Sequence, residues 1–374
     1  MNKEDKIYIA GHRGLVGSAI LKNLQERGYS NFVLRTHAEL ELCDQDAVNR
    51  FFDEEMPDYV FLAAAHVGGI MANNRYRADF IYRNLQIQNN VIHNAWRTGV
   101  KKLLFLGSTC IYPRDAPQPM SEDCLLTSPL EYTNEPYAIA KIAGLKMCES
   151  YNLQYGTNFI AVMPTNLYGP NDNFDLERSH VLPALIRKMH LGKCLQANDW
   201  VSLRQDLNRN PIECVNNGAS ETEILAILAK YGVRVFQGTK QTSSSPWFTA
   251  QNNVSVEIWG TGTPLREFLW SEDMADACVY IMKEIFFADL YDREQDIRNS
   301  HINIGTGQEL SIHQLAELIA KIVGFTGQII FNTNKPDGAK RKLADSRKLC
   351  QLGWQHKIDI STGISQVYQW YRTF

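Results

Sequence analysis

The chain has 374 residues, of which 44% are hydrophobic and 21% are charged. This composition is typical of a globular protein long enough for one large domain or two ordinary domains, and no segment approaches a membrane span. The formal charge of -3, without a run of lysine or arginine, argues against nucleic acid as a partner and favours small molecules.

The N-terminal segment combines a short apolar stretch, 6–10, with three glycines in a GxxGxxG pattern. Gly11, Gly14 and Gly17 precede and open an amphipathic stretch, 15–27, that has helical spacing. A strand, a glycine turn and a helix in this order bring backbone N–H groups to a pyrophosphate. The pattern predicts a dinucleotide-binding turn, although a glycine turn without a ligand has the same local sequence.

The end of the second predicted strand, 31–35, indicates which dinucleotide is bound. NAD-specific folds usually carry an Asp or Glu there, whereas this chain has Arg35 and then His37, with Arg13 inside the glycine turn. Two guanidinium groups and an imidazole suit a 2′-phosphate, so we predict NADP(H) rather than NAD(H). The alternative is that Arg35 is simply a solvated residue at a strand end.

Strands and helices alternate through the rest of the first half. Predicted helices at 44–55 and 73–97 alternate with strands at 59–63 and 101–106, and a later strand covers 159–163. This order is typical of a Rossmann-type, doubly wound parallel α/β sheet, in which ligands bind at the carboxyl ends of the strands. Small residues that would let a cofactor lie close to the third strand are Ala63, Ala64 and Ala65.

Three side chains are candidates for proton transfer. Ser108 follows the fourth predicted strand, and Tyr137 and Lys141 are four residues apart on a predicted helix, so they project from one face. An ammonium beside a phenol favours the phenolate, and a serine hydroxyl can hold a carbonyl oxygen in line with the phenol. Because the Tyr-x-x-x-Lys spacing recurs by chance, the interpretation depends on Ser108 and on the glycine turn.

The composition changes over 194–253, which is rich in Asn, Gln, Ser and Thr. One helix is clear there, at 220–233, where Ser220 and Glu223 form a capping box. The sequence TKQTSSSPW, 239–247, predicts an exposed loop. We interpret 194–253 as an insertion that carries at least one small helix.

The later segments are too short for a second doubly wound sheet. We therefore expect a cofactor-binding domain over 1–165 with returning segments near 255–305, and a smaller mixed α/β substrate-binding part over 166–374. The eight cysteines have no paired or CxxC spacing, which predicts reduced thiols in a cytoplasmic protein and no metal site.

Several longer motifs carry a resemblance to a known family. They are GHRGLVGSAI (11–20), LLFLGSTCIYP (103–113), TNEPYAIAKIAG (133–144), MPTNLYGPNDNF (163–174) and WGTGTPLREFL (259–269). With them the chain resembles the extended short-chain dehydrogenase/reductase family, and within it the enzymes that act on GDP-linked 4-keto-6-deoxy sugars. The resemblance, which spans 6–374 apart from the insertion, implies C3/C5 epimerisation, NADPH-dependent reduction of the C4 ketone, and a homodimer.

The resemblance also implies roles for single residues. In this family a cysteine and a histidine invert C3 and C5, and these positions hold Cys110, as the thiolate base, and His180, as the acid. Tyr137 would protonate the C4 oxygen. The residues implied for the cofactor are Gly11, Arg13, Gly14, Leu15, Val16, Gly17, Arg35, His37, Ala63, Ala64, Ala65, Leu106, Tyr137, Lys141, Pro164, Asn166, Leu167 and His180. Those implied for the substrate are Asn166, Arg187, Trp259, Arg266 and Lys342.

Other functions stay open at this point. A sister enzyme could act on a related GDP-4-keto sugar, either a 3,6-dideoxy sugar or a heptose, through the same residues. A 4-epimerase or 4,6-dehydratase would retain NAD, which Arg13 and Arg35 disfavour. A cofactor-binding regulator without chemistry would typically have lost Tyr137 or Lys141, and both are present. On composition alone, Cys110 could also be a small core residue.

Overall fold

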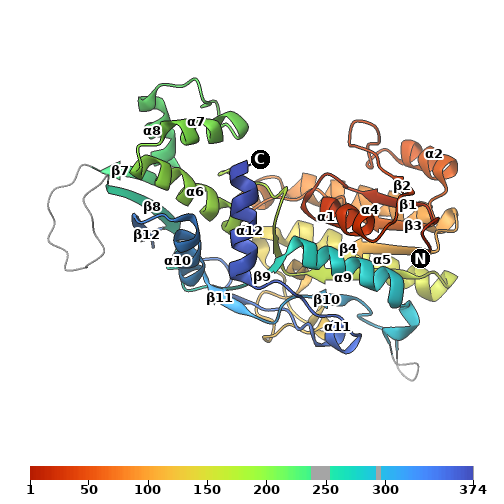
Figure 1. Cartoon of the computed structure of the whole chain (residues 1–374). Helices are drawn as coiled ribbons and strands as arrows, with labels where there is room; N and C mark the ends of the chain where they lie inside the picture. The colour runs from red at the N-terminus through yellow and green to blue at the C-terminus, as the bar shows by residue number, and fades with distance from the viewer. Residues whose placement is uncertain (237–252, 292–295, 374) are drawn as a thin grey trace. The chain divides into compact units, whose positions relative to one another are not determined.

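The computed structural model describes residues 1–236, 253–291 and 296–373. Within these ranges the chain forms two compact units. Figure 1 colours the chain by residue number from red to blue. The first unit comprises 1–172, 267–309 and 342–363, and the second comprises 173–266, 310–341 and 364–374. The predicted division did not include the return of 342–363 to the first unit. The predicted loop at 239–247 lies outside the described residues.

The first unit is built on a six-stranded parallel sheet with the order β10-β5-β4-β3-β1-β2. Its strands are short runs of apolar residues buried on both faces, which is typical of parallel sheets covered by helices. The predicted doubly wound α/β class is confirmed. The strands are β1 (Ile7–Ala10), β2 (Phe32–Val33), β3 (Tyr59–Leu62), β4 (Lys102–Leu106), β5 (Phe159–Pro164) and β10 (Ile302–Ile304).

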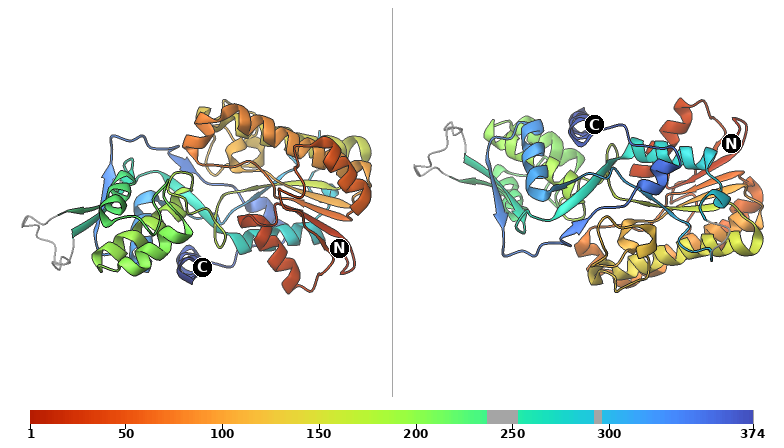
Figure 2. Two further views of the ribbon diagram at one scale, coloured as in Figure 1. Left: turned by 90° about the horizontal axis from the view of Figure 1, so that it is seen from above. Right: turned by 90° about the horizontal axis from the view of Figure 1, so that it is seen from below.

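Helices cover both faces of this sheet, and each face has its own apolar cluster. The red α1 and the teal α9 pack together on one face, and α4 packs on α5 on the other (Figure 2). The helices of this unit are α1 (Leu15–Glu26), α2 (Gln45–Glu55), α3 (Ile70–Arg75), α4 (Arg77–Arg97), α5 (Glu135–Tyr155), α9 (Ser271–Glu284) and α11 (Arg347–Gln351). The single helix predicted over 73–97 is in fact α3 and α4, because Tyr76, with φ −109° and ψ 42°, interrupts the helical backbone.

The second unit has a three-stranded sheet of β7 (Val233–Phe236), β8 (Asn253–Trp259) and β12 (Gln328–Asn332), in the order β12-β8-β7. Helix α6 packs on β8 and on α10. The capping box predicted at Ser220 forms at the start of α8, and Gly232, with φ +85°, follows the helix. The helices are α6 (Val181–Gln196), α7 (Trp200–Arg209), α8 (Glu221–Lys230), α10 (Ile312–Val323) and the greater part of α12 (Ile360–Thr373).

The remaining strands form a small sheet in which β9 is central. They are β6 (Asn166–Tyr168), β9 (Leu265–Trp270), β11 (Glu309–Ser311) and β13 (Arg341–Lys342), and the chain passes from one unit to the other within the last three. Over the described ranges, no helix has both the length and the apolar character needed to cross a membrane.

Candidate active site

The glycine turn between β1 and α1 has the close packing that a dinucleotide-binding turn needs. Gly11 has φ +84°, and a Cβ at this position would lie 2.8 Å from the backbone nitrogen of Ala64. A Cβ on Gly17 would lie 2.1 Å from the carbonyl oxygen of Gly11. Helix α1 starts after Gly14 with no side-chain cap and no acidic residue in its first turn, so its N-terminal N–H groups suit an anion.

The cations predicted to select NADP(H) have partners that local sequence did not reveal. The guanidinium of Arg35 forms an ion pair with Glu55, donates to the carbonyl of Leu34 at 3.0 Å, and has its centre 5.8 Å from the Phe51 ring centroid. His37 lies 2.7 Å from the carboxylate of Glu41. A 2′-phosphate at the end of β2 would therefore compete with two carboxylates.

Lys141 joins helix α5 to the end of β4. It is 3% exposed, and its ammonium donates to the carbonyl of Leu106 at 2.8 Å. The ammonium also lies 5.8 Å from the ring centroid of Tyr137, so the predicted shared face exists. Burial lowers the pKa of Lys141 to about 8.

The effect expected of Lys141 on Tyr137 is not present in this structure. Tyr137 is half-buried, and burial together with the nearby Cys110 raises the pKa of its phenol above the ordinary value. The expectation of a favoured phenolate was wrong because desolvation of the phenol dominates here. A protonated Tyr137 can act as a proton donor.

Ser108 and Cys110 lie in one turn immediately after β4. The hydroxyl of Ser108 accepts from the backbone N–H of Cys110 at 3.3 Å and caps the 3₁₀ turn Thr109–Ile111. Burial raises the pKa of the Cys110 thiol, while the positive charges of Lys342 and Lys141 and the bond from Ser108 oppose this shift. Cys110 is only 8% exposed, so its burial alone does not distinguish a reactive thiol from a small core residue.

The predicted substrate residues are divided between the two units. Asn166 and Lys342 lie in the first unit, where the side-chain amide of Asn166 donates to the carbonyl of Glu267 at 2.9 Å. His180, Trp259 and Arg266 lie in the second.

These three second-unit side chains differ in exposure. His180 is exposed at the N-cap of α6, yet partial desolvation lowers the pKa of its imidazole. Trp259 is 52% exposed, with the ammonium of Lys335 5.1 Å from its ring centroid. Arg266 is partly buried and donates to the carbonyl of Leu265 at 2.7 Å.

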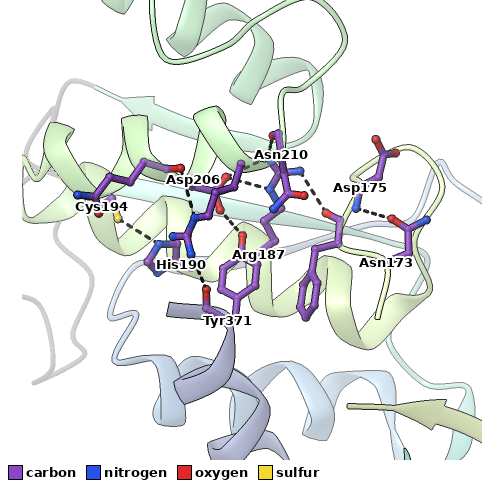
Figure 3. A network of polar contacts seen from close by, with 11 residues as sticks. Asn173, Asp175, Arg187, His190, Cys194, Asp206, Asn210 and Tyr371 are labelled. Atoms are coloured by element: carbon purple, nitrogen blue, oxygen red, sulfur yellow. Dashed lines mark hydrogen bonds and ion pairs between the residues drawn. The ribbon is translucent and has the colours of Figure 1, made fainter. Parts of the chain in front are cut away.

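The structure contradicts the role predicted for Arg187 (Figure 3). Arg187 is fully buried, and its Nε and Nη2 donate to Oδ1 of Asp206 at 3.0 and 2.9 Å. Its Nη1 donates to the carbonyl of Phe174 at 3.1 Å, and Nη2 also donates to the carbonyl of Asn210. A guanidinium engaged on all sides inside one unit cannot bind the diphosphate of a substrate.

Sequence reasoning missed two polar side chains that support the site. Asn84, 2% exposed, binds both backbone groups of His66 at 2.9 Å and so holds the loop after β3. Glu267 is fully buried, and its carboxylate accepts from the backbone N–H groups of Thr306, Gly307 and Ala344 at 2.6, 2.7 and 3.0 Å. In the sequence, these two supporting roles were indicated by nothing more than a polar residue within a pattern of apolar residues.

Four of the other predicted cofactor residues lie at the carboxyl ends of strands of the six-stranded sheet. Ala63 and Ala64 directly follow β3, Leu106 ends β4 and Pro164 ends β5, while Leu167 lies in β6. Parallel strands expose their carboxyl ends on one edge, which is the ligand-binding edge of this fold.

Comparison with known proteins accords with this geometry. A family model described as "NAD dependent epimerase/dehydratase family" matches residues 7–210 and 211–305. The chain is 50% identical to GDP-L-fucose synthase 1 of Arabidopsis thaliana, with 99% of this chain and 94% of that protein covered. It is 46% identical to GDP-L-fucose synthase of Escherichia coli strain K12, with 99% and 97% covered.

A solved structure is also similar along the whole chain. It is a GDP-D-glycero-L-gluco-heptose synthase from Campylobacter jejuni in the presence of NADPH, with 45% identity, a TM-score of 0.88, and 100% of this chain and 99% of that chain covered. The resemblance predicted from the motifs is thus confirmed. The chain belongs to the NAD dependent epimerase/dehydratase family.

Proposed function

We propose that the protein converts GDP-4-keto-6-deoxy-D-mannose to GDP-L-fucose. The reaction comprises epimerisation at C3 and C5 and NADPH-dependent reduction of the C4 ketone. The observation that carries this proposal is the placement of Cys110 in the same turn as Ser108, directly after β4 and within the field of Lys141. The names of the relatives at 46% and 50% identity support the same reaction.

The epimerisation needs a base and an acid, because the C4 ketone acidifies the protons at C3 and C5 and each must be removed and replaced. Cys110 takes the proton as a thiolate. Burial raises the pKa of this thiol, whereas the charges of Lys342 and Lys141 are the groups that favour its ionisation. His180 returns a proton from the other face of the ring.

The reduction uses the Tyr137 phenol as the proton donor to the C4 oxygen, and the hydroxyl of Ser108 donates to the same oxygen. Bound NADPH supplies the hydride for C4. The tight turn at Gly11 and Gly17 fits a dinucleotide, and Lys141 would hold the nicotinamide ribose. The raised pKa of Tyr137 suits its role, since the phenol must carry a proton when the ketone is reduced.

For the GDP moiety we propose Asn166, Trp259, Arg266 and Lys342, without Arg187. A tryptophan that is 52% exposed can stack on a base or a sugar, and a guanidinium suits a diphosphate. Burial lowers the pKa of Arg266, with Asp337 opposing the shift, so its positive charge would gain from an anionic ligand.

We further propose a homodimer formed through α4 and α5. Four large side chains on these helices are more than 40% exposed: Tyr82, Ile139, Leu153 and Tyr155. Sedimentation at micromolar concentration should give a species of twice 42.6 kDa. We propose a cytoplasmic location, since the eight cysteines are all free thiols.

A second candidate is a GDP-4-keto-heptose as the substrate. It is favoured by the Campylobacter jejuni heptose synthase, which is nearly as identical to this chain as the fucose synthases are. The same acid, base and reductive residues would serve both sugars.

The test is to incubate the protein with NADPH and GDP-4-keto-6-deoxy-D-mannose in D2O. Loss of absorbance at the NADPH band, with deuterium at both C3 and C5 of the product, is the expected result. An absence of NADPH oxidation with this sugar, but turnover of a GDP-4-keto-heptose, would favour the second candidate. Binding of NADPH without turnover of either sugar would contradict both.

A further inference from the structure

A buried polar network joins three helices of the second unit, α6, α7 and α12, around Arg187 (Figure 3). We propose that Arg187 is a positioning residue for His180, and that α7 supplies the anchor that this role requires. The inference rests on the proposed role of His180 as the epimerisation acid. It assigns a function to part of the 194–253 segment, which the sequence marks as an insertion.

The first step is the connection from Arg187 to the turn that leads to His180. Nη1 of Arg187 donates to the carbonyl of Phe174 at 3.1 Å, and Phe174 is 5% exposed. A compact turn follows, in which Oδ1 of Asp175 accepts from the backbone N–H groups of Glu177 and Arg178, each at 2.9 Å. The backbone carbonyl of Asp175 accepts from the N–H of Ser179 at 2.8 Å.

His180 comes directly after this turn and is the N-cap of α6. Arg187 lies on α6, about two helical turns further on. The segment from Phe174 to His180 is thus attached to α6 at both ends, covalently at His180 and through the guanidinium at Phe174. Such a closed arrangement restricts where the imidazole of His180 can lie.

The second step is the anchor of the guanidinium itself. Asp206 of α7 is 1% exposed and accepts from Nε and Nη2 of Arg187, and its other oxygen accepts from the hydroxyl of Tyr371. Arg209 of α7 donates to the carbonyl of Tyr371 at 3.2 Å. Helix α7 therefore fixes both the guanidinium and the last turns of α12.

The third step is to explain why a charged pair, rather than two apolar residues, occupies this buried position. A buried ion pair seldom stabilises a protein more than apolar residues of similar volume, because its desolvation is costly. A guanidinium has a directional fork of donors that an apolar side chain lacks, and here it reaches a carboxylate and two backbone carbonyls at once. The buried pair of Arg187 and Asp206 is therefore explained by the geometry that it fixes rather than by added stability.

The decisive experiment replaces the charged group by apolar residues of similar size, in the full-length protein. The triple variant Arg187→Met, Asp206→Leu, Tyr371→Phe leaves no unpaired buried charge and is expected to fold. We expect deuterium incorporation at C3 and C5 of the sugar in D2O to fall about tenfold or more. NADPH affinity should stay within about twofold, because the cofactor residues proposed here, His180 apart, lie in the first unit or at its edge.

The matched control is Tyr368→Phe. It removes the hydroxyl that lies 3.2 Å from Nδ1 of His190, and within the described parts of the chain no hydrogen bond joins this hydroxyl to Phe174 or Asp206. The rate of deuterium exchange at C3 and C5 in the Tyr368→Phe variant should equal that of the wild type. The pH profile of the exchange rate should have one limb that reports the titration of His180 and that the His180→Gln variant lacks. The pH at which this limb lies should shift in the triple variant and stay unchanged in Tyr368→Phe.

The outcomes separate this inference from the proposed function. If His180→Gln exchanges at the wild-type rate, the acid role of His180 fails, and the inference fails with it. If His180→Gln is impaired but the triple variant exchanges within about twofold of wild type, only the positioning role is overturned. Should the triple variant not fold, Arg187→Lys decides: it keeps the charge without the fork, and a wild-type exchange rate would overturn the inference.

Discussion

The hydroxyl of Tyr112 donates to Oδ1 of Asn303 at 2.5 Å, and both side chains are buried. Tyr112 directly follows the turn that contains Cys110, and Asn303 is the central residue of β10. Nε2 of His301 lies 2.9 Å from the same hydroxyl, while its Nδ1 has no partner among the described residues. The hydroxyl can therefore accept from Nε2–H of a neutral imidazole, and the three side chains tie the Cys110 turn, which follows β4, to β10 on the far side of β5.

Replacing Tyr112 by phenylalanine should affect both stability and epimerisation. The change leaves the Asn303 oxygen buried with one donor fewer, which costs about 1–3 kcal/mol of unfolding free energy. Because the end of the Cys110 turn loses its tether, we expect deuterium exchange at C3 and C5 to slow several-fold. Urea unfolding and exchange in D2O measure the two effects.

The control for that change is Tyr29→Phe, which removes a hydroxyl bonded to the carbonyl of Met1 at 3.2 Å in the same unit. It should leave the exchange rate unchanged. An equal loss of exchange in both variants would mean that Tyr112 has no specific connection to Cys110.

His301 predicts a pH dependence of stability. Burial, with the charges of Lys348 and Lys146, lowers the pKa of its imidazole well below the ordinary value of about 6.5 that it regains on unfolding. Below pH 6.5 the unfolded chain therefore binds more protons than the folded one, so this contribution to stability is present above pH 6.5 and is lost as pH falls. Between pH 6.5 and 5.5 the loss is about 1 kcal/mol.

Urea unfolding of wild type and His301→Gln at pH 7.5, 6.5 and 5.5 measures this contribution. The difference between the two proteins removes the titration of other groups, such as the raised pKa values of Glu122 and Glu267. The free energy of the variant should fall less steeply on acidification. Parallel curves for the two proteins would show that His301 titrates in the folded state as it does in the unfolded chain, and a less steep fall in the wild type would show that its folded pKa is raised.

The parts that could be predicted from the sequence depend on local patterns. Gly11, Gly14 and Gly17 carry their spacing within a single turn, and Tyr137 and Lys141 share a face because a helix fixes positions four residues apart. The strands of the sheet could also be predicted, because each is a local run of apolar residues. A capping box at Ser220 likewise needs only residues three apart.

The parts that could not be predicted depend on partners distant in the chain. Arg187 pairs with Asp206, 19 residues away, and the same carboxylate accepts from Tyr371, 165 residues further along the chain. An arginine that looks suited to a diphosphate is therefore structural. Arg35 meets Glu55 in the same way. Composition and spacing carry no information about which distant carboxylate reaches a given cation.

Lys141 should matter more for the cofactor than for the fold. Its ammonium donates to one backbone carbonyl, and burial lowers its pKa to about 8, so removing the charge also removes a desolvation cost. In Lys141→Met we expect a melting temperature near that of the wild type, a weaker NADPH affinity, and reduction slowed by about 100-fold or more.

Lys146→Met provides the comparison for Lys141, since it changes a lysine on the same helix that pairs with Glu149 at 2.8 Å. Fluorescence titration with NADPH and stopped-flow oxidation measure binding and reduction. Similar losses in both variants would indicate a general effect on α5 rather than a role for Lys141 at the cofactor.

Arg35 and Glu55 predict how the cofactor preference can be changed. Arg35 binds Glu55 in this structure, so a 2′-phosphate at Arg35 must compete with that carboxylate. Arg35→Ala should weaken NADPH about 10- to 100-fold relative to NADH, which corresponds to the loss of a charge-assisted contact of about 1.5–3 kcal/mol. Glu55→Gln should strengthen NADPH binding, because it removes the competing charge while keeping the shape of the side chain.

His37→Ala is the comparison for Arg35→Ala. The imidazole side chain of His37 is 80% exposed and paired with Glu41, so its effect on the ratio of the NADPH and NADH dissociation constants should be smaller. An unchanged ratio in Arg35→Ala would remove Arg35 from the proposed 2′-phosphate site and leave Arg13 as the cation to test next.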